Sequence, residues 1–290
     1  MNTPIIMVET FRVPLQEVWK AITDQAAMQQ WYFDIEDFTL TEGDSFNFYE
    51  GPAKAYHHRC EVLEVVPNKR FRHTWTHPSH SKGTSILTWE LDEIDGETRL
   101  TLTHEDTENF ADAGSDFSKA NFEVGWHGIV RINLRNYLYH IERVPFTVEI
   151  NAPAEKVWEV MWNKDSYTQW TTPFCAGSYY EGDLEANEIV HFLAPDGSGM
   201  YSQVFYVKPY EKIIFSHIGS VKEGEEMPVD EETRLWTGSL EMYTLTEKDG
   251  VTTLLAEVDV DQKHKDYMLS TFPKALAEVK RLSTDAETII

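Results

Sequence analysis

Three histidines stand in stretches where apolar and polar residues alternate, which is the pattern of a half-buried strand. Side chains two positions apart share one face of a strand, so each imidazole is predicted to face inward beside apolar neighbours. The three groups are His73 with Phe71 and Trp75, His104 with Leu100 and Leu102, and His217 with Ile213 and Phe215. A histidine in such a place can orient a polar ligand through a hydrogen bond, or act as a general acid or base.

Aromatic and apolar side chains are predicted to complete a pocket around these histidines. Concave apolar cavities with a few converging polar groups are the sites at which proteins bind small molecules. The predicted lining is Trp31, Phe71, His73, Trp75, His104 and Trp126 in the first half of the chain, and Trp170, Phe215, His217 and Phe272, with Ile213 and Met242, in the second half. The alternative is that these tryptophans fill the core and that the histidines are satisfied core residues. Truncation distinguishes the two, because removing a core tryptophan costs about 3–5 kcal/mol of stability, whereas removing a cavity tryptophan costs less and weakens binding.

A second group of histidines is close enough in sequence to be considered as a candidate metal site. His73, His77 and His80 lie near the run Tyr56–His58, but their spacing matches no closed structural zinc pattern, and Cys60 adds only one thiol. His77 and His80 flank Pro78, in what is predicted to be an exposed hairpin loop. The chain also contains no Gly-x-Ser-x-Gly elbow, phosphate loop or dinucleotide fingerprint. We therefore predict no catalytic residue, no metal and no cofactor.

The elements that must position these residues follow one order in the first half. A strand over residues 5–13 leads into a helix that begins at Pro14, whose missing N–H costs nothing in a first turn. A short helix over residues 28–31 follows, and then a meander of strands containing residues 46–48, 62–65, 71–75, 84–91 and 98–104. The meander includes an Asp95-Gly96 hairpin turn. An apolar stripe from Phe122 to Ile141 predicts one long closing helix.

The second half repeats this order. An offset of 139 joins Pro14 to Pro153, Trp19 to Trp158, Trp31 to Trp170 and Gly43 to Gly182. Strands are predicted at residues 146–150, 189–193, 201–207, 213–218 and 235–245 and after the Asp249-Gly250 turn. A closing helix is predicted through residues 268–282, with a kink or a late start at Pro273. Trp19 and Trp158 are predicted to be core residues.

The repeat predicts an α+β protein of two tandem domains, residues 1–143 and 144–290, joined by only Val144-Pro145. Each domain is expected to be a curved antiparallel sheet of about six to seven strands around a long C-terminal helix, with two short helices after the first strand. If the sheet does not close on that helix, the space between them can form a cavity.

Composition excludes several classes of partner. The net charge of −24 argues against nucleic acid, since affinity for phosphate comes from Lys and Arg, and it disfavours an anionic membrane surface. The chain has only two cysteines, Cys60 and Cys175, and so few cysteines fit the reducing interior of a cell. No signal peptide and no membrane span are indicated, so a cytoplasmic protein is expected.

The first half resembles a known family. The resemblance rests on residues 13–24 (VPLQEVWKAITD), Trp31, Gly43, residues 62–70 with Pro67, residues 73–75, residues 98–104 and Gly125-Trp126. Together they resemble an activator of heat shock protein 90 ATPase homologue-like domain, of the START and birch-pollen-allergen (SRPBCC) superfamily. Residues 145–284 resemble a more divergent member, with Phe272 where Gly-Trp would be expected. The resemblance implies a helix-grip fold, and relatives include co-chaperones, binders of hydrophobic ligands, and polyketide cyclases or aromatases.

Three functions follow as hypotheses. The leading one is a non-enzymatic protein that holds a small apolar or aromatic molecule in the first domain, with the second domain as a further candidate. The next is a co-chaperone or other protein-binding module acting on a heat-shock ATPase, whose acidic surface docks a basic partner. The third is a cyclase-like or hydrolase-like enzyme that uses His73 or His104 as its acid or base. It requires a histidine that cavity water can reach.

Overall fold

The structure is a computed structural model that describes residues 3–284, without the side chain of Pro52. The chain divides into two compact units, the first ending at Leu138 and the second beginning at Tyr139. Each unit combines one antiparallel sheet with helices, and the sheets have six and eight strands. This confirms the predicted α+β class and the tandem helix-grip architecture. Within the described residues, no helix combines the length and the apolar character needed to cross a membrane.

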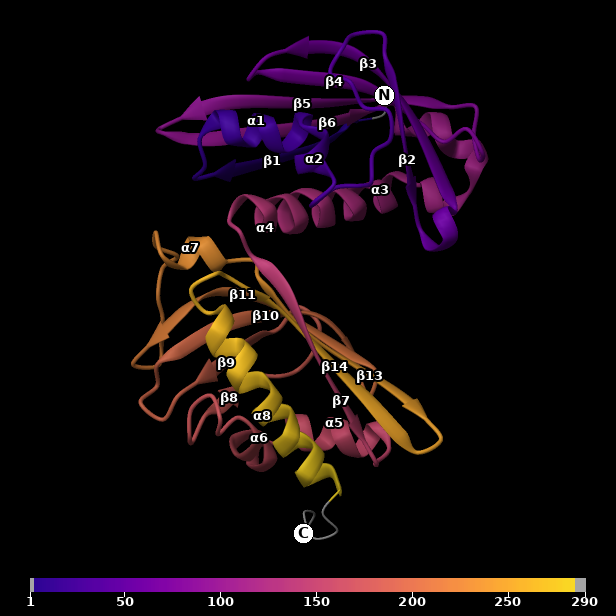
Figure 1. Cartoon of the computed structure of the whole chain (residues 1–290). Helices are drawn as coiled ribbons and strands as arrows, with labels where there is room; N and C mark the ends of the chain where they lie inside the picture. Colours follow the sequence, from indigo (N-terminus) through magenta and orange to yellow (C-terminus); the bar gives the residue numbers. More distant parts are fainter. Residues whose placement is uncertain (1–2, 285–290) are drawn as a thin grey trace. The chain divides into compact units, whose positions relative to one another are not determined.

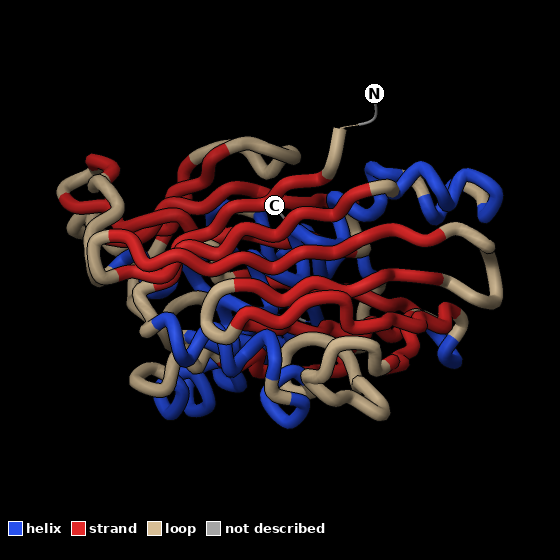
Figure 2. The backbone as a smooth tube through the Cα atoms, turned by 90° about the horizontal axis from the view of Figure 1, so that it is seen from above, coloured by secondary structure: helices blue, strands red, loops and turns tan. Residues whose placement is uncertain are grey.

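In the first unit, six strands run side by side in the order β1-β6-β5-β4-β3-β2 (Figures 1 and 2). Asp95 and Gly96, both with positive φ, form the tight turn between β5 and β6, as predicted. The elements are β1 (Ile5–Phe11), α1 (Leu15–Thr23), α2 (Gln25–Met28), β2 (Ser45–Glu50), η1 (Pro52–Lys54), β3 (Tyr56–Val66), β4 (Arg70–Thr76), β5 (Thr84–Ile94), β6 (Glu97–Glu105), η2 (Thr107–Ala113), η3 (Ser115–Phe117), α3 (Lys119–Trp126), η4 (His127–Leu134) and α4 (Arg135–Leu138).

In the second unit, the sheet order is β7-β14-β13-β11-β10-β9-β8, with β12 paired to β11. The short strands β8 and β12 carry too few residues to show an alternation, and the sequence did not predict them. The elements are β7 (Glu142–Ile150), α5 (Ala154–Trp162), α6 (Lys164–Trp170), β8 (Tyr179–Glu181), β9 (Ile189–Leu193), β10 (Gly199–Lys208), β11 (Lys212–Lys222), β12 (Glu225–Glu226), α7 (Thr233–Trp236), β13 (Leu240–Lys248), β14 (Val251–Val260) and α8 (Lys265–Thr284).

The long helix of the first unit is continuous but not uniform. The chain passes from α3 into a π-helical segment, η4, and then into α4. Its buried apolar residues recur every four positions, at Trp126, Val130, Leu134 and Leu138. That spacing is longer than the 3.6 residues of an α-helical turn and suits the wider π turn. The helix therefore keeps one apolar stripe against the sheet. Figure 1 shows the helix from α3 to α4 lying along the sheet of the first unit.

Residues related by the repeat make the same contacts in both units. The indole N–H of Trp31 donates to the carbonyl of Ala21 at 2.9 Å, and that of Trp170 donates to the carbonyl of Met161 at 2.9 Å. Each tryptophan thus ties the second short helix to the first. The prediction that Trp19 and Trp158 are core residues is wrong, because both are only half-buried.

Three further predictions about the elements are wrong in detail. Val144 and Pro145 are not a linker but lie inside β7, an edge strand, where a proline without an N–H is tolerated. Leu235 belongs to α7, and the following strand begins at Leu240. The closing helix begins at Lys265, well before Pro273, so of the two outcomes predicted at this proline, a kink or a late start, the late start is wrong.

Candidate functional site

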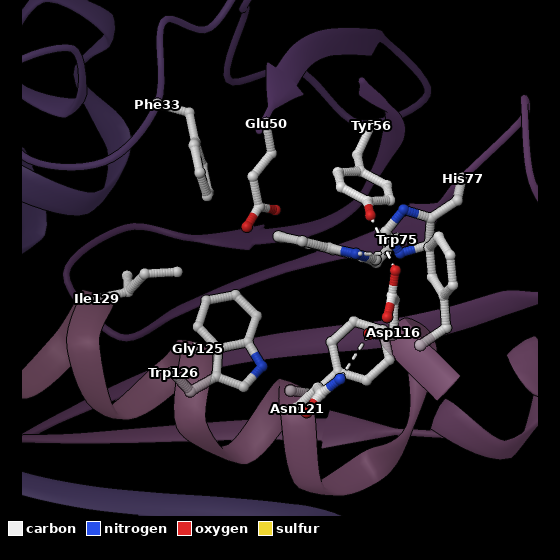
Figure 3. Close-up of a pocket in the computed structure, with 12 residues that line it drawn as sticks. Phe33, Glu50, Tyr56, Trp75, His77, Asp116, Asn121, Gly125, Trp126 and Ile129 are labelled. Atoms are coloured by element: carbon white, nitrogen blue, oxygen red, sulfur yellow. Dashed lines mark hydrogen bonds between the residues drawn. The ribbon is translucent and has the colours of Figure 1, made fainter. Parts of the chain in front are cut away.

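A cavity of about 190 Å³ lies in the first unit, between the long helix and the strands β2 to β4 (Figure 3). We call it the first-unit cavity. Its position is the one that the helix-grip prediction indicated, between sheet and closing helix. Twelve residues line it: Phe33, Glu50, Tyr56, Trp75, His77, Asp116, Phe117, Asn121, Phe122, Gly125, Trp126 and Ile129.

The inner wall of the cavity is aromatic and buried. Trp75 from β4 and Trp126 from α3 are 3% and 2% exposed, and their ring centroids are 5.2 Å apart with the planes at 67°. This edge-to-face arrangement is the favourable one for two electron-rich rings. Phe122 lies one helical turn before Trp126 and belongs to the same wall. The two predicted tryptophans Trp75 and Trp126 are therefore brought together at the cavity.

A directional chain of hydrogen bonds fixes the Trp126 ring. Its indole N–H can only donate, and it donates to His104 Nδ1 at 3.0 Å. His104 must then carry its proton on Nε2, which lies 2.7 Å from Ser85 Oγ. The Ser85 hydroxyl in turn donates to the backbone carbonyl of Trp75 at 3.3 Å. Both imidazole nitrogens of His104 are thus occupied.

Burial keeps His104 neutral. It lowers the pKa of His104 to about 3, with a smaller contribution from nearby His73. A neutral imidazole of fixed tautomer serves here to hold Trp126 in place. His104 itself is fully buried and lies outside the cavity lining.

His77 corrects a prediction, because it is not in an exposed loop. Its side chain is only 2% exposed and lines the cavity, since the inward face of β4 continues past the strand end from Trp75 to His77. His77 Nε2 accepts the indole N–H of Trp75 at 3.1 Å, so its proton sits on Nδ1. That buried Nδ1 has no hydrogen-bond partner among the described residues. Burial lowers the pKa of His77 to about 3, and His58 adds to this.

The rim of the cavity is polar and acidic. Glu50, Asp116, Asn121 and Gly125 are exposed, and Figure 3 shows the Glu50 carboxylate pointing toward Trp126. The hydroxyl of Tyr56 donates to Asp116 Oδ2 at 3.0 Å, and this bond raises the pKa of Tyr56. The rim therefore carries two carboxylates above an aromatic interior.

Gly125 leaves part of the cavity open. Asn121, Gly125 and Ile129 recur every four residues and so form one row along the helix. A Cβ placed on Gly125 would meet no atom within 4 Å. Any side chain at this position would extend into space that the cavity now occupies.

The other predicted residues of the first unit are buried but lie outside the cavity lining. The alternation that predicted them is confirmed, since Phe71, His73 and Trp75 share the buried face of β4. Trp31 ties the short helices together. Phe71 and His73 pack deeper in the core, where burial lowers the pKa of His73 to about 4.

In the second unit the predicted residues lie in or beside a densely packed core. Phe272 stacks on Phe146 at 4.7 Å, and Phe215 packs against Trp162 at 5.4 Å. Trp170 is buried with its N–H satisfied, as described above. His217 Nδ1 lies 2.8 Å from Ser202 Oγ and its Nε2 lies 3.6 Å from Glu241, apart from the main cluster of apolar side chains.

Several lining residues were missed by the sequence analysis. Asp116 and Phe117 come from a 3₁₀ segment, and Phe33 from a loop, where no periodicity marks an inward side chain. Glu50 is one of 49 acidic residues, and no pattern in the sequence distinguishes it. Gly125 carried a signal, because it stands beside Trp126 in the stretch that resembles the family. Among the described residues no group of three or more His, Cys, Asp or Glu side chains is arranged to hold a metal ion.

Solved structures with a similar chain path include both one-domain and two-domain proteins. DynU16, from the dynemicin biosynthetic locus, is 16% identical and covers 98% of this chain and 100% of its own, with a TM-score of 0.40. The di-domain ARO/CYC protein StfQ of the steffimycin biosynthetic pathway is 12% identical, covers 96% and 97% of the two chains and has a TM-score of 0.39. MLL2253 from Mesorhizobium loti is 20% identical over 48% of this chain and 98% of its own, with a TM-score of 0.40.

The sequence of the first unit matches a family model. No curated protein is significantly similar to the chain. Residues 12–138, by contrast, match the model of the family described as Activator of Hsp90 ATPase homolog 1-like protein. This range contains the whole lining of the first-unit cavity. The first unit therefore contains a domain similar to those of the Activator of Hsp90 ATPase homolog 1-like family.

Proposed function

We propose that the first unit binds a small aromatic or apolar molecule in the first-unit cavity, without chemical conversion. The observation that carries this proposal is an open space of about 190 Å³ bordered by two buried tryptophans that hydrogen bonds hold in place. Rings that are fixed before a ligand arrives lose little freedom on binding, which favours affinity.

The chemistry of the histidines supports binding over catalysis. His104 has both nitrogens engaged and His73 lies outside the lining, so neither is placed to exchange a proton with a molecule in the cavity. His77 reaches the lining, but its Nε2 is occupied by Trp75 and its Nδ1 is buried. These contacts make the histidines parts of the wall.

The size of the cavity limits the ligand. Pockets for drug-sized molecules span roughly 300–1,000 Å³, and this one is smaller, so it suits a molecule with a single ring system. Burying roughly 200 Å² of such a ring contributes about 5 kcal/mol before the cost of association. The expected affinity is therefore modest, in the micromolar to millimolar range.

Gly125 and Gly128 provide a matched test. Both lie on the long helix and neither has an atom within 4 Å of an added Cβ, but only Gly125 lines the cavity. In the full-length chain, Gly125→Leu should fill the mouth and weaken binding of indole by at least about tenfold, while Gly128→Leu should leave it unchanged. Both changes remove a glycine from a helix and should not destabilise it.

Isothermal titration calorimetry with indole is the measurement. Equal weakening in both variants would place the bound indole elsewhere and contradict the proposal. The proposal would also be contradicted if the wild-type protein bound neither indole nor any other single-ring compound of similar size. The interior would then have to be packed too tightly to admit a ligand.

A further inference from the structure

The charges around the first-unit cavity are of one sign. Two of its twelve lining residues, Glu50 and Asp116, are carboxylates, and none is a lysine or an arginine. Glu50 belongs to the end of β2 and Asp116 to η3, so the two come from different elements to the same rim. The whole chain adds a net charge of −24.

The protein does not neutralise these carboxylates. Glu50 Oε2 lies 3.2 Å from His58 Nε2, but burial lowers the pKa of His58, so the ring carries no charge at neutral pH. Asp116 accepts the neutral hydroxyl of Tyr56. Neither carboxylate has a Lys or Arg partner within the described residues, and Lys54, after β2, pairs with Glu36 instead. Negative charge is therefore left at the mouth of an otherwise apolar cavity.

The walls favour a positive charge as well. The faces of Trp75, Trp126 and Tyr56 are electron-rich, and a cation close to such a face is attracted by the ring quadrupole. Inside a partly enclosed site this attraction is larger than in water, because the dielectric is lower. An anionic ligand would meet repulsion from the rim and gain nothing from the walls.

The size of the cavity limits what such a cation can be. It takes one ring system, and the carboxylates lie at the rim while the tryptophans lie inside (Figure 3). A ring and a charge at opposite ends of a short molecule would match this arrangement. We propose that the ligand of the first-unit cavity is an arylalkyl amine in its protonated form, with the ring against Trp75 and Trp126 and the ammonium group at Glu50 and Asp116. This inference rests on the proposed binding function and specifies its substrate class.

Three compounds of the same shape test the proposal on the full-length chain at neutral pH. They are 2-phenylethylamine, which is cationic, 2-phenylethanol, which is neutral, and phenylacetate, which is anionic. At low ionic strength the amine should bind roughly tenfold more tightly than the alcohol, and phenylacetate should bind most weakly. The preference for the amine should shrink as salt is added, because the rim carboxylates are partly exposed.

Charge-removing variants identify the groups responsible. Glu50→Gln and Asp116→Asn should each lower the affinity for the amine several-fold and leave the affinity for the alcohol unchanged. Glu93→Gln is the control, since it removes the same charge from an exposed position at the far end of β5. An equal loss in all three variants would mean that only the net charge of the chain acts, and it would overturn the assignment to the rim.

The outcomes separate this inference from the proposed function. If the alcohol binds as tightly as the amine and Gly125→Leu abolishes both, the cavity binds neutral rings and the cation proposal is wrong. If none of the three compounds binds, the binding function itself fails. A preference for phenylacetate would also overturn the cation proposal while leaving a binding cavity in place.

Discussion

The long helices of the two units face their sheets in different ways. In the first unit, Trp126 meets Trp75 edge to face, donates a hydrogen bond to His104 and borders a cavity of about 190 Å³. In the second, Phe272 stacks flat on Phe146, with centroids 4.7 Å apart and planes at 7°, and meets Phe174 at 5.1 Å. The helix tryptophan of the first unit thus borders a cavity and makes a polar bond, whereas the helix phenylalanine of the second unit packs between rings.

The difference shows which parts of the repeat define the fold. Trp31 and Trp170 each donate to a carbonyl of the first helix of their unit, and the side chains of Asp24 and Asn163 each cap the second short helix. The side chains that differ between units are those that face the long helix. A duplicated scaffold can therefore carry two different interiors, and each interior must be judged from its own side chains.

The largest expected effect tests the packing around Phe272 in the second unit. Phe272→Ala should lower the free energy of unfolding of the second unit by about 3–5 kcal/mol, because it deletes a ring that is packed on several sides. Leu269→Ala is the control on the same helix, since Leu269 is 45% exposed and should cost little. Urea denaturation of the full-length chain, with hydrogen exchange to assign the transition to one unit, measures both.

A small effect of Phe272→Ala would break the comparison. If it cost no more than Leu269→Ala, the second unit would have to tolerate a void beside its helix. If Phe272→Ala does create a cavity, the second unit of the variant should also bind indole, since a dry apolar void accepts small apolar molecules.

The next effect follows from the buried histidines, which are concentrated in the first unit. His58, His73, His77 and His104 are buried there, whereas His217 is the one buried histidine of the described second unit. Burial lowers the pKa of His73 to about 4 and of His77 and His104 to about 3, from an ordinary value of 6.5. Below pH 6.5 the unfolded chain therefore binds protons that the folded unit does not.

The sign follows from this difference in bound protons. The stability that each neutral buried histidine contributes to the first unit is fully present above about pH 6.5. It is lost as the pH falls toward about 4 for His73 and about 3 for His77 and His104. The loss is about 1.4 kcal/mol per histidine and pH unit. Acidification from about pH 7.5 to about pH 5.5 should therefore cost the first unit about 4 kcal/mol. Peptide-resolved hydrogen exchange, corrected for its intrinsic pH dependence, should show this loss in residues 3–138 and a smaller one in the second unit. Equal losses in both units would contradict the pKa shifts.

The sequence predicted the framework well because the framework is periodic. Alternation located the inward faces of β4 and β6, and the Asp95-Gly96 turn followed from its φ requirements. The repeat predicted two domains of the same architecture, since the matched spacing of Pro, Trp and Gly leaves little freedom for the order of helices and strands to differ.

The cavity was harder to predict because its rim is not periodic. Asp116 and Phe117 reach it from a 3₁₀ segment whose course depends on tertiary packing. His77 follows the end of β4, where the charged and polar residues around Pro78 resemble an exposed loop. It is buried by the packing of side chains from other elements, among them Phe110 and Phe117. Whether an inward tryptophan fills a core or borders a void also depends on what lies opposite, and a single sequence does not show this.

The smallest of the three effects concerns the hydrogen bond from Trp126 to His104, which the second unit lacks at Phe272. Trp126→Phe makes the helix of the first unit like that of the second, and it removes the donor to His104 Nδ1. A buried acceptor left without a partner costs about 1–3 kcal/mol, so the first unit should lose stability in that range. Trp19→Phe is the control, because Trp19 is half-buried on α1 and should cost less.

A spectroscopic measurement separates this bond from simple loss of volume. In the wild-type protein, ¹⁵N NMR of the imidazole should show His104 protonated on Nε2 and unprotonated on Nδ1, because Trp126 can only donate. In Trp126→Phe the Nδ1 resonance should shift, since its hydrogen bond is gone, while Trp19→Phe leaves it in place. A wild-type His104 protonated on Nδ1 would mean that Trp126 does not donate a hydrogen bond to it. The rigidity of Trp126, on which the binding proposal depends, would then need another cause.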